Sequence, residues 1–365
     1  MKIVLGVVFL LLAAATSYAA PNVSAISGQF SDDQQVVIQG SGFGQNSLNI
    51  EWLGGKNGAI ESGSAGQAFS RTNWENAWGW ANLAYATDQK ESGVKSLKVN
   101  PDSANNWNGI MSYNLTSPVN AGGGLFISYW VRKTTSGSGQ WKMLRVSGND
   151  TVVDGSQEVV LFNWLGTGSQ QLVVDPGQGN DQTTWVNDVY PTADNTWYRM
   201  DLYLKASSLN GSDGSITINR ITPGSATAAQ TISGLKTHLS GYSWNHVIWQ
   251  NYVGNGMNNG TFWFDDVYIQ NGSQARVELG DSSTWSGCTI REIQYPTSWA
   301  DGSITVKLNQ GRFSSGANAY LYVVDSNGNV NSNGYSVMLG TSGSGGGGTG
   351  TVSPVGNVRA TKINP

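Results

Sequence analysis

Cysteine and histidine are nearly absent from this chain, and charged side chains are scarce. The 365 residues include one cysteine, Cys288, and two histidines, His238 and His246. One cysteine excludes an internal disulfide and a cysteine-based zinc cage, and two histidines exclude a three-histidine metal site within the chain. Charged residues make up 12% of the sequence, the net charge is −4, and lysine and arginine form no cluster. Because binding to phosphates needs a basic face, we expect no nucleic-acid partner.

Long hydrophobic runs are absent beyond the N-terminus. Lys2 precedes an apolar stretch at residues 3–15, and Ser17-Tyr18-Ala19 fits a small-x-small cleavage site. The stretch is short for a membrane span, so residues 1–19 are predicted to be a signal peptide rather than a retained anchor. We therefore expect a secreted or cell-surface protein without a membrane span.

Glycine and aromatic residues are abundant. The chain has 48 Gly, 15 Trp, 14 Tyr and 9 Phe, and apolar residues make up 39% of it. Short alternating segments such as residues 125–132, 197–205 and 262–269 are separated by Gly/Ser/Asn turns. Alternation with period two is typical of strands that bury one face. The sequence predicts an all-β fold class.

Two segments near the ends of the chain have the pattern of one small sandwich. The first, residues 21–53, contains a short β run and a G-S-G-F-G turn at residues 40–44. The second, residues 274–340, contains W-A-D-G-S-I-T-V from residue 299 and a D-S-N-G turn. These motifs resemble the start and the end of the TIG/IPT immunoglobulin-like family. The resemblance implies a discontinuous immunoglobulin-like sandwich, and three tandem domains are the alternative. Residues 341–365 are predicted to be a Gly/Ser-rich linker and tail.

The middle of the chain, residues 54–273, has the strand density of a larger sandwich. It carries S-Y-W-V at 128–131, W-K-M-L-R at 141–145, W-Y-R-M-D-L-Y-L-K at 197–205 and F-D-D-V-Y-I at 264–269. In these motifs it resembles the concanavalin A-like superfamily, which includes laminin-G-like, lectin-like and polysaccharide-lyase members. The resemblance implies a jelly-roll β-sandwich, inserted into or mounted between the immunoglobulin-like elements.

Hydrolysis of a glycan is not expected. Glycosidases of this superfamily carry E-x-D-x-x-E on one strand, because retaining hydrolysis needs two carboxyl groups about 5 Å apart. The motif does not occur here. A polysaccharide lyase instead needs a cation or amide that neutralises a uronate carboxylate, and a Tyr or His that transfers protons. The strand at residues 244–253 fits, since alternation places His246, Gln250 and Tyr252 on one face.

The positive charge for such a site is predicted to come from a second strand. Lys142 and Arg145 belong to the same motif, and regular alternation points their side chains to opposite faces. The candidate catalytic residues are therefore His246, Tyr252 and Arg145. The Q-x-H motif of the family's lyases is absent. Its absence favours the hypothesis of glycan binding without catalysis over the hypothesis of a lyase.

Sugar rings stack on aromatic side chains, and amides bind their hydroxyl groups. Several tryptophans lie in Asn/Gly-rich segments, namely Trp74, Trp78, Trp80, Trp107 and Trp185. The predicted ligand-binding residues are Gln250, Tyr252, His246, Lys142 and Trp185. The first hypothesis is an exported glycan-binding or adhesion-type protein, whose partner is a polysaccharide or cell-surface glycan. The alternatives are a lyase acting on a uronate-containing polymer and a purely structural cell-surface protein.

No cofactor is predicted, and no metal ligands are assigned. A Ca²⁺ site would need several converging oxygens, and no motif supports one. Asp265 and Asp266 are expected on opposite faces of their strand, in a structural role.

Overall fold

The computed structural model describes most of the chain between Ala19 and Gly343. The described residues are 19–76, 83–100, 110–137, 139–148, 158–165, 169–176, 182–186, 188–239, 243–253, 257–340 and 342–343. The predicted signal peptide, apart from Ala19, and nearly all of the predicted tail lie outside these residues.

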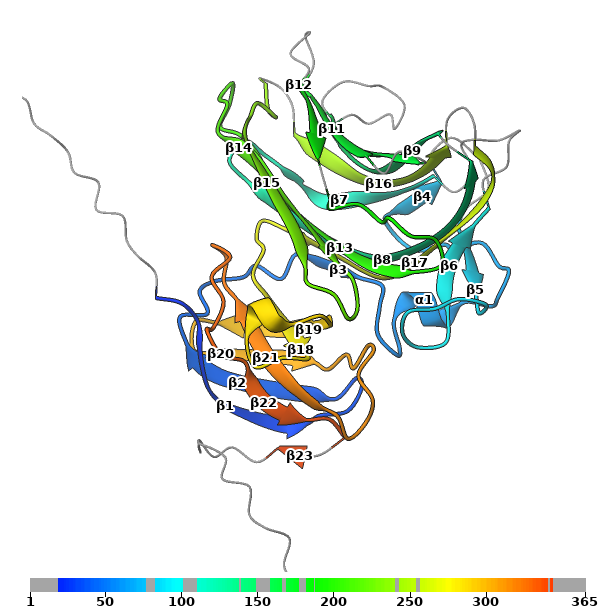
Figure 1. Ribbon diagram of the computed structural model, residues 1–365. Helices are drawn as coiled ribbons and strands as arrows, with labels where there is room; N and C mark the ends of the chain where they lie inside the picture. Colours follow the sequence, from blue (N-terminus) through cyan, green and yellow to red (C-terminus); the bar gives the residue numbers. More distant parts are fainter. Residues whose placement is uncertain are drawn as a thin grey trace, which may run out of the picture.

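The middle of the chain forms two stacked antiparallel sheets (Figure 1). The seven-stranded sheet has the order β12 (Gln182–Val186), β11 (Ser169–Asp175), β10 (Glu158–Leu165), β9 (Gly139–Ser147), β16 (Trp244–Val253), β7 (Met111–Val119) and β4 (Trp74–Asn76). The eight-stranded sheet has the order β15 (Ala228–Leu235), β14 (Gly214–Ile221), β13 (Trp197–Lys205), β8 (Gly124–Gly137), β17 (Met257–Asn271), β6 (Ser96–Val99) and β5 (Ala84–Ala86), and β3 (Ile50–Trp52) also pairs with β17. Both sheets curve in the same sense, and the seven-stranded sheet lies on the inner side of the curve.

The core between these sheets is built from side chains at alternate positions along the strands. In β14, for example, buried positions alternate with more exposed ones over most of the strand. Large aromatic side chains fill the space between the sheets, including Trp141, Trp249 and Phe262, each at most 2% exposed. Burial of each such side chain contributes about 1.5–3 kcal/mol or more, so the alternation fixes which face of each strand turns inward.

The two ends of the chain build the second sandwich together. Its strands are β1 (Asn22–Gln29), β2 (Gln35–Ser41), β18 (Arg276–Gly280), β19 (Arg291–Ala300), β20 (Ser303–Lys307), β21 (Asn318–Val324), β22 (Tyr335–Met338) and β23 (Ser342–Gly343). β2 pairs with β20, where Val36 lies opposite Val306 and Ile38 opposite Ile304. The first half of β19 pairs with β18 and the second half with β20, so β19 passes from one layer of this sandwich to the other. One core joins Ile26 and Phe43 to Val277 and Leu321.

The all-β prediction is confirmed, with a β-sandwich that fits a jelly roll and a second, smaller one. Helical structure in the described part consists of α1 (Ala59–Ser62) and the 3₁₀ turn η1 (Trp285–Gly287). No described helix has the length and apolar character to cross a membrane. The first residues of the predicted linker differ from expectation, because β23 extends the sheet beside β1. Assignment to the TIG/IPT family stays a prediction.

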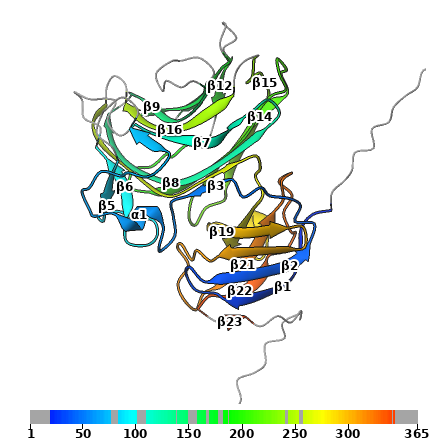
Figure 2. The same ribbon diagram turned by 180° about the vertical axis from the view of Figure 1, so that it is seen from behind.

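The small sandwich packs against the outer side of the eight-stranded sheet (Figures 1 and 2). This explains why β13 is buried on both faces: Met200 and Leu202 enter the jelly-roll core, while Arg199 and Asp201 face the small sandwich. The Arg199 guanidinium donates to both carboxylate oxygens of Asp201 at 2.8 and 3.0 Å and to Oε2 of Glu278 at 3.0 Å. Glu278 lies on β18, so a buried ion network crosses the interface.

Candidate functional site

The inner side of the curve carries a polar face, which we define as the side of the seven-stranded sheet turned away from the core. Register places its residues in rows across the strands. One row runs through Asp175, Glu158, Ser147, His246 and Asn114; a second runs through Val173, Val160, Arg145, Ile248 and Ser112; and a third runs through Trp185, Gln171, Phe162, Lys142 and Tyr252. Polar residues predominate, as expected of a sheet face that does not form the core.

A β-bulge in β9 corrects one prediction about this face. Leu144 pairs with Leu161 and Lys142 with Phe162, which leaves Met143 as an extra residue in β9. Met143 and Leu144 are both buried in the core at 0% and 3% exposure. The expectation that Lys142 and Arg145 point to opposite faces is therefore wrong. The bulge interrupts alternation and returns both cations to the polar face.

The two cations differ in their surroundings. Arg145 is 5% exposed, and its Nη1 lies 2.9 Å from Oε2 of Glu158 on β10. Burial lowers the pKa of Arg145, and the Glu158 carboxylate opposes that shift. Lys142 is half-buried; burial lowers its pKa, and the nearby Arg145 guanidinium lowers it further. Lys142 is thus the more accessible of the two positive charges.

His246 belongs to a different part of the face. It is 7% exposed, with Nδ1 2.7 Å from Oδ1 of Asn114 and 3.5 Å from Oγ of Ser112. Ser147, its neighbour on β9, pairs with Glu158 on β10, four positions from the partner of Lys142, which corresponds to about 13 Å. His246 therefore lies nearer to Arg145 than to Lys142.

Tyr252 lies opposite Lys142 in the strand register. The side chains of Tyr252 and Gln250 lie outside the described residues, although their backbone belongs to β16. The three candidate catalytic residues consequently fall in two places: His246 near Arg145, and Tyr252 beside Lys142.

Trp185 is on a strand, although the sequence around it is rich in Asn and Gly. It lies on β12, is 54% exposed, and stands at the end of the row that contains Lys142. Three strand spacings separate the two residues, which corresponds to about 14 Å. Trp74 is also on a strand, where its ring stacks on Trp249 at 5.3 Å, so it belongs to the core. Trp78, Trp80 and Trp107 lie outside the described residues.

Sequence reasoning missed Asn114 and Ser112. Both lie on β7, which was not recognised as a neighbour of β16. Their alternation with the buried Met111 and Tyr113 is visible in the sequence and indicates a half-buried strand. The sequence pattern does not predict the pairing of β7 with β16, which brings Asn114 next to His246.

A second group of ionisable residues lies between the two sandwiches. Ligand atoms of Glu91, Asp266 and Glu292 lie within 4.8 Å of one another, and all three residues are buried. Glu292 comes from the small sandwich and the others from the jelly roll. These are the residues in the described part that could hold a cation. Arg312 forms an ion pair with Oε1 of Glu91.

Asp265 and Asp266 do not lie on opposite sides, contrary to the expectation from alternation. A bulge in β17 lies between Asp265 and Tyr268, and the backbone of Asp266 has a φ of 43°. Oδ2 of Asp265 accepts hydrogen bonds from the backbone N–H groups of Glu91 and Ser92, and Oδ2 of Asp266 accepts one from the Ser92 hydroxyl. Both carboxyl groups therefore bind the same segment, residues 91–92.

Stability is expected to fall as the pH rises above the ordinary carboxyl range. Burial, reinforced by neighbouring carboxylates, raises the pKa of Glu91, Asp265 and Glu292 well above their usual values. Groups with a raised folded-state pKa bind more protons in the folded protein, so their contribution is full below about pH 4 and declines at higher pH. Glu292→Gln removes one of these charges. It should stabilise the protein more at pH 8 than at pH 4.5, by about 1–3 kcal/mol.

Urea unfolding at the two pH values, in EDTA, measures this difference. Glu75→Gln is the matched control, because Glu75 is exposed on β4. An effect of Glu292→Gln that is the same at both pH values would show that folding does not raise the pKa of Glu292.

Comparisons with known proteins give structural matches only. No family model matches the sequence, and no curated protein matches it. Among solved structures, a marine PL-14 alginate lyase from Aplysia kurodai aligns with a TM-score of 0.42 and 11% identity over 54% of this chain and 90% of its own. An endo-β-1,4-glucuronan lyase from the fungus Trichoderma reesei aligns with a TM-score of 0.39 and 12% identity over 55% of this chain and 95% of its own.

Proposed function

We propose that the protein is an exported polysaccharide lyase that acts on a uronate-containing polymer at the polar face. The observation that carries this proposal is the bulge at Met143, which puts Lys142 on that face, half-buried, opposite Tyr252 in the register and in one row with the exposed Trp185. A cation, a phenol and an aromatic platform are the groups that elimination from a uronate residue needs.

The reaction would proceed without water as a reactant. Lys142 pairs with the uronate carboxylate and stabilises the negative charge that develops when C5 loses its proton. The electron pair forms the C4=C5 double bond, the bond from C4 to the glycosidic oxygen breaks, and that oxygen takes a proton. Tyr252 serves the proton transfers, while Trp185 supports a sugar unit further along the row. His246, which contacts Asn114 at 2.7 Å, lies outside this row and takes no part in the proposed reaction.

A non-catalytic glycan-binding protein is the second candidate. The exposed Trp185 favours it, because stacking needs no catalytic group. Incubation of the full chain with alginate and with polyglucuronate separates the two candidates. A lyase gives a steady rise in ultraviolet absorbance from unsaturated chain ends and new reducing ends in equal number. Binding without either product supports the second candidate, and neither binding nor product contradicts both.

A further inference from the structure

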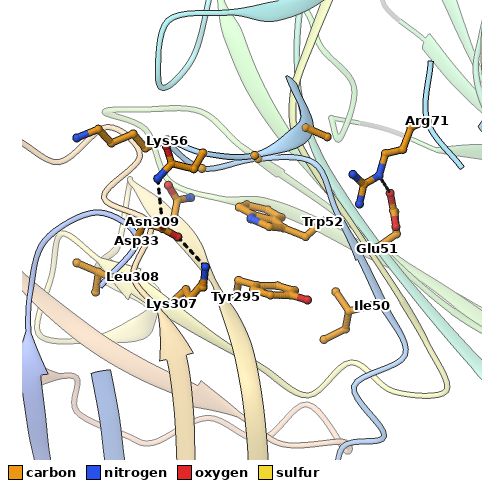
Figure 3. A pocket seen from close by; sticks show the side chains of 15 residues that line it. Asp33, Ile50, Glu51, Trp52, Lys56, Arg71, Tyr295, Lys307, Leu308 and Asn309 are labelled. Carbon is orange, nitrogen blue, oxygen red and sulfur yellow. Dashed lines mark hydrogen bonds and ion pairs between the residues drawn. The ribbon is translucent and has the colours of Figure 1, made fainter. Parts of the chain in front are cut away.

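A cavity of about 230 Å³ lies at the junction of the two sandwiches, on the opposite side of the jelly roll from the polar face (Figure 3). β3 and the segment that follows it form one wall, with Trp52 at its centre. Tyr295 on β19 and Lys307 on β20 come from the small sandwich. The volume is below the 300–1,000 Å³ usual for drug-sized ligands, so it suits one ring rather than a long segment of polymer.

Two aromatic rings from different sandwiches face this cavity. Figure 3 shows Trp52 and Tyr295 one above the other, both half-buried. An edge contact with Tyr268, at 5.9 Å between centroids, holds the Trp52 ring from behind. Within the described part of the chain, neither the Trp52 indole N–H nor the Tyr295 hydroxyl forms a hydrogen bond, although each lines the cavity. Both rings therefore offer an apolar face and a polar group to a ligand.

Charged groups surround the rings. Asp33 accepts hydrogen bonds from Asn57 at 2.9 Å and from Lys307 at 3.1 Å, and these lower its pKa, so it remains a carboxylate. Glu51 pairs with Arg71 at 2.6 Å. Lys56, exposed on the rim, adds a third cation against two carboxylates. The lining thus carries one positive charge in excess.

We propose that this cavity is a second saccharide-binding site, which takes one pyranose ring of an acidic polysaccharide against Trp52 and Tyr295. The C–H face of the ring stacks on the aromatic side chains, and the sugar hydroxyl groups meet Asp33, Asn57 and the indole N–H. Lys56 binds the sugar carboxylate. Because the walls come from both sandwiches, the site exists only while they are joined, and ligand sites are common at such junctions.

Isothermal titration calorimetry with a uronate trisaccharide tests this site. The full chain carries Lys142→Met, which removes the cation proposed to serve the lyase reaction, so that turnover does not interfere. Tyr295→Ala in this protein should lower the affinity about threefold to tenfold, the usual cost of a lost stacking ring. Lys56→Glu, a change at an exposed residue, should weaken binding of the uronate more than binding of a neutral cello-trisaccharide. Lys205→Glu, an exposed lysine at the end of β13, is the control and should change neither affinity.

Unchanged affinity in both Tyr295→Ala and Lys56→Glu, with normal circular dichroism, would overturn the proposal. If Tyr295→Ala does not fold, Lys56→Glu decides alone. The result is independent of the proposed lyase activity, because a wild-type protein that forms no unsaturated product can still lose affinity through these two substitutions.

Discussion

Lys142→Met is expected to reduce the rate of polyuronate cleavage by about 100-fold to 1,000-fold. Methionine keeps much of the length of the side chain and removes its charge, so the developing negative charge at C5 and its carboxylate loses its partner. Removal of a single group that stabilises charge in a transition state costs a factor of this size in kcat. The initial rate of ultraviolet absorbance increase, measured on alginate and on polyglucuronate, gives the value.

The control for this substitution is Lys205→Met. Lys205 is exposed at the end of β13, in the other sheet, so the same chemical change there should leave the rate unchanged. Tyr252→Phe should match the loss in Lys142→Met if the two residues act together, and the double variant should then lose little more than either alone. Full activity in Lys142→Met would rule out the row of Lys142 as the site.

Much of the polar face follows from the sequence, and the part that does not has a local cause. Alternation in residues 244–253 gave the correct face for Val247 and Trp249, which lie in the core, and for His246, which does not. The same rule failed for Lys142 and Arg145, because it assumes one residue per step. Whether Met143 bulges depends on how β9 pairs with β10, and no pattern within β9 alone contains that information.

The contacts at the junction between the sandwiches could not be predicted from the sequence, for a different reason. The sequence places Arg199 and Glu278 on two separate alternating strands and does not predict that they are in contact. Their hydrogen bond spans 79 residues of sequence and exists only because the small sandwich covers the outer face of β13. Glu292 and Asp266 meet in the same way. Alternation predicts the faces of regular strands, whereas contacts between the two sandwiches depend on how these pack together.

Arg199→Met should lower the free energy of unfolding by about 3–5 kcal/mol, the range for a buried ion pair that loses one partner. Arg199 is 1% exposed and supplies hydrogen bonds to Asp201, Glu278, Ser128 and the Arg291 carbonyl oxygen. Burial alone would raise the pKa of Glu278, but Arg199, Arg276 and Arg291 hold it far below its usual range. Without Arg199, the other two arginines still compensate Glu278, whereas the charge of Asp201 stays buried without an equivalent partner.

Urea unfolding, followed by tryptophan fluorescence and by circular dichroism, measures this effect. Asp201→Asn added to Arg199→Met should recover part of the loss, because it removes the uncompensated carboxylate; two independent defects would instead add. Arg71→Met is the surface control: Arg71 pairs with Glu51 but its side chain is 41% exposed, so the cost should stay below about 1 kcal/mol.

Arg199 lies on β13 and Glu278 on β18, so the loss of Arg199 weakens the junction as well as each sandwich. In Arg199→Met, the unfolding transitions followed by the two probes should therefore no longer coincide. A single transition shifted by less than about 1 kcal/mol would show that packing rather than this ion network joins the sandwiches.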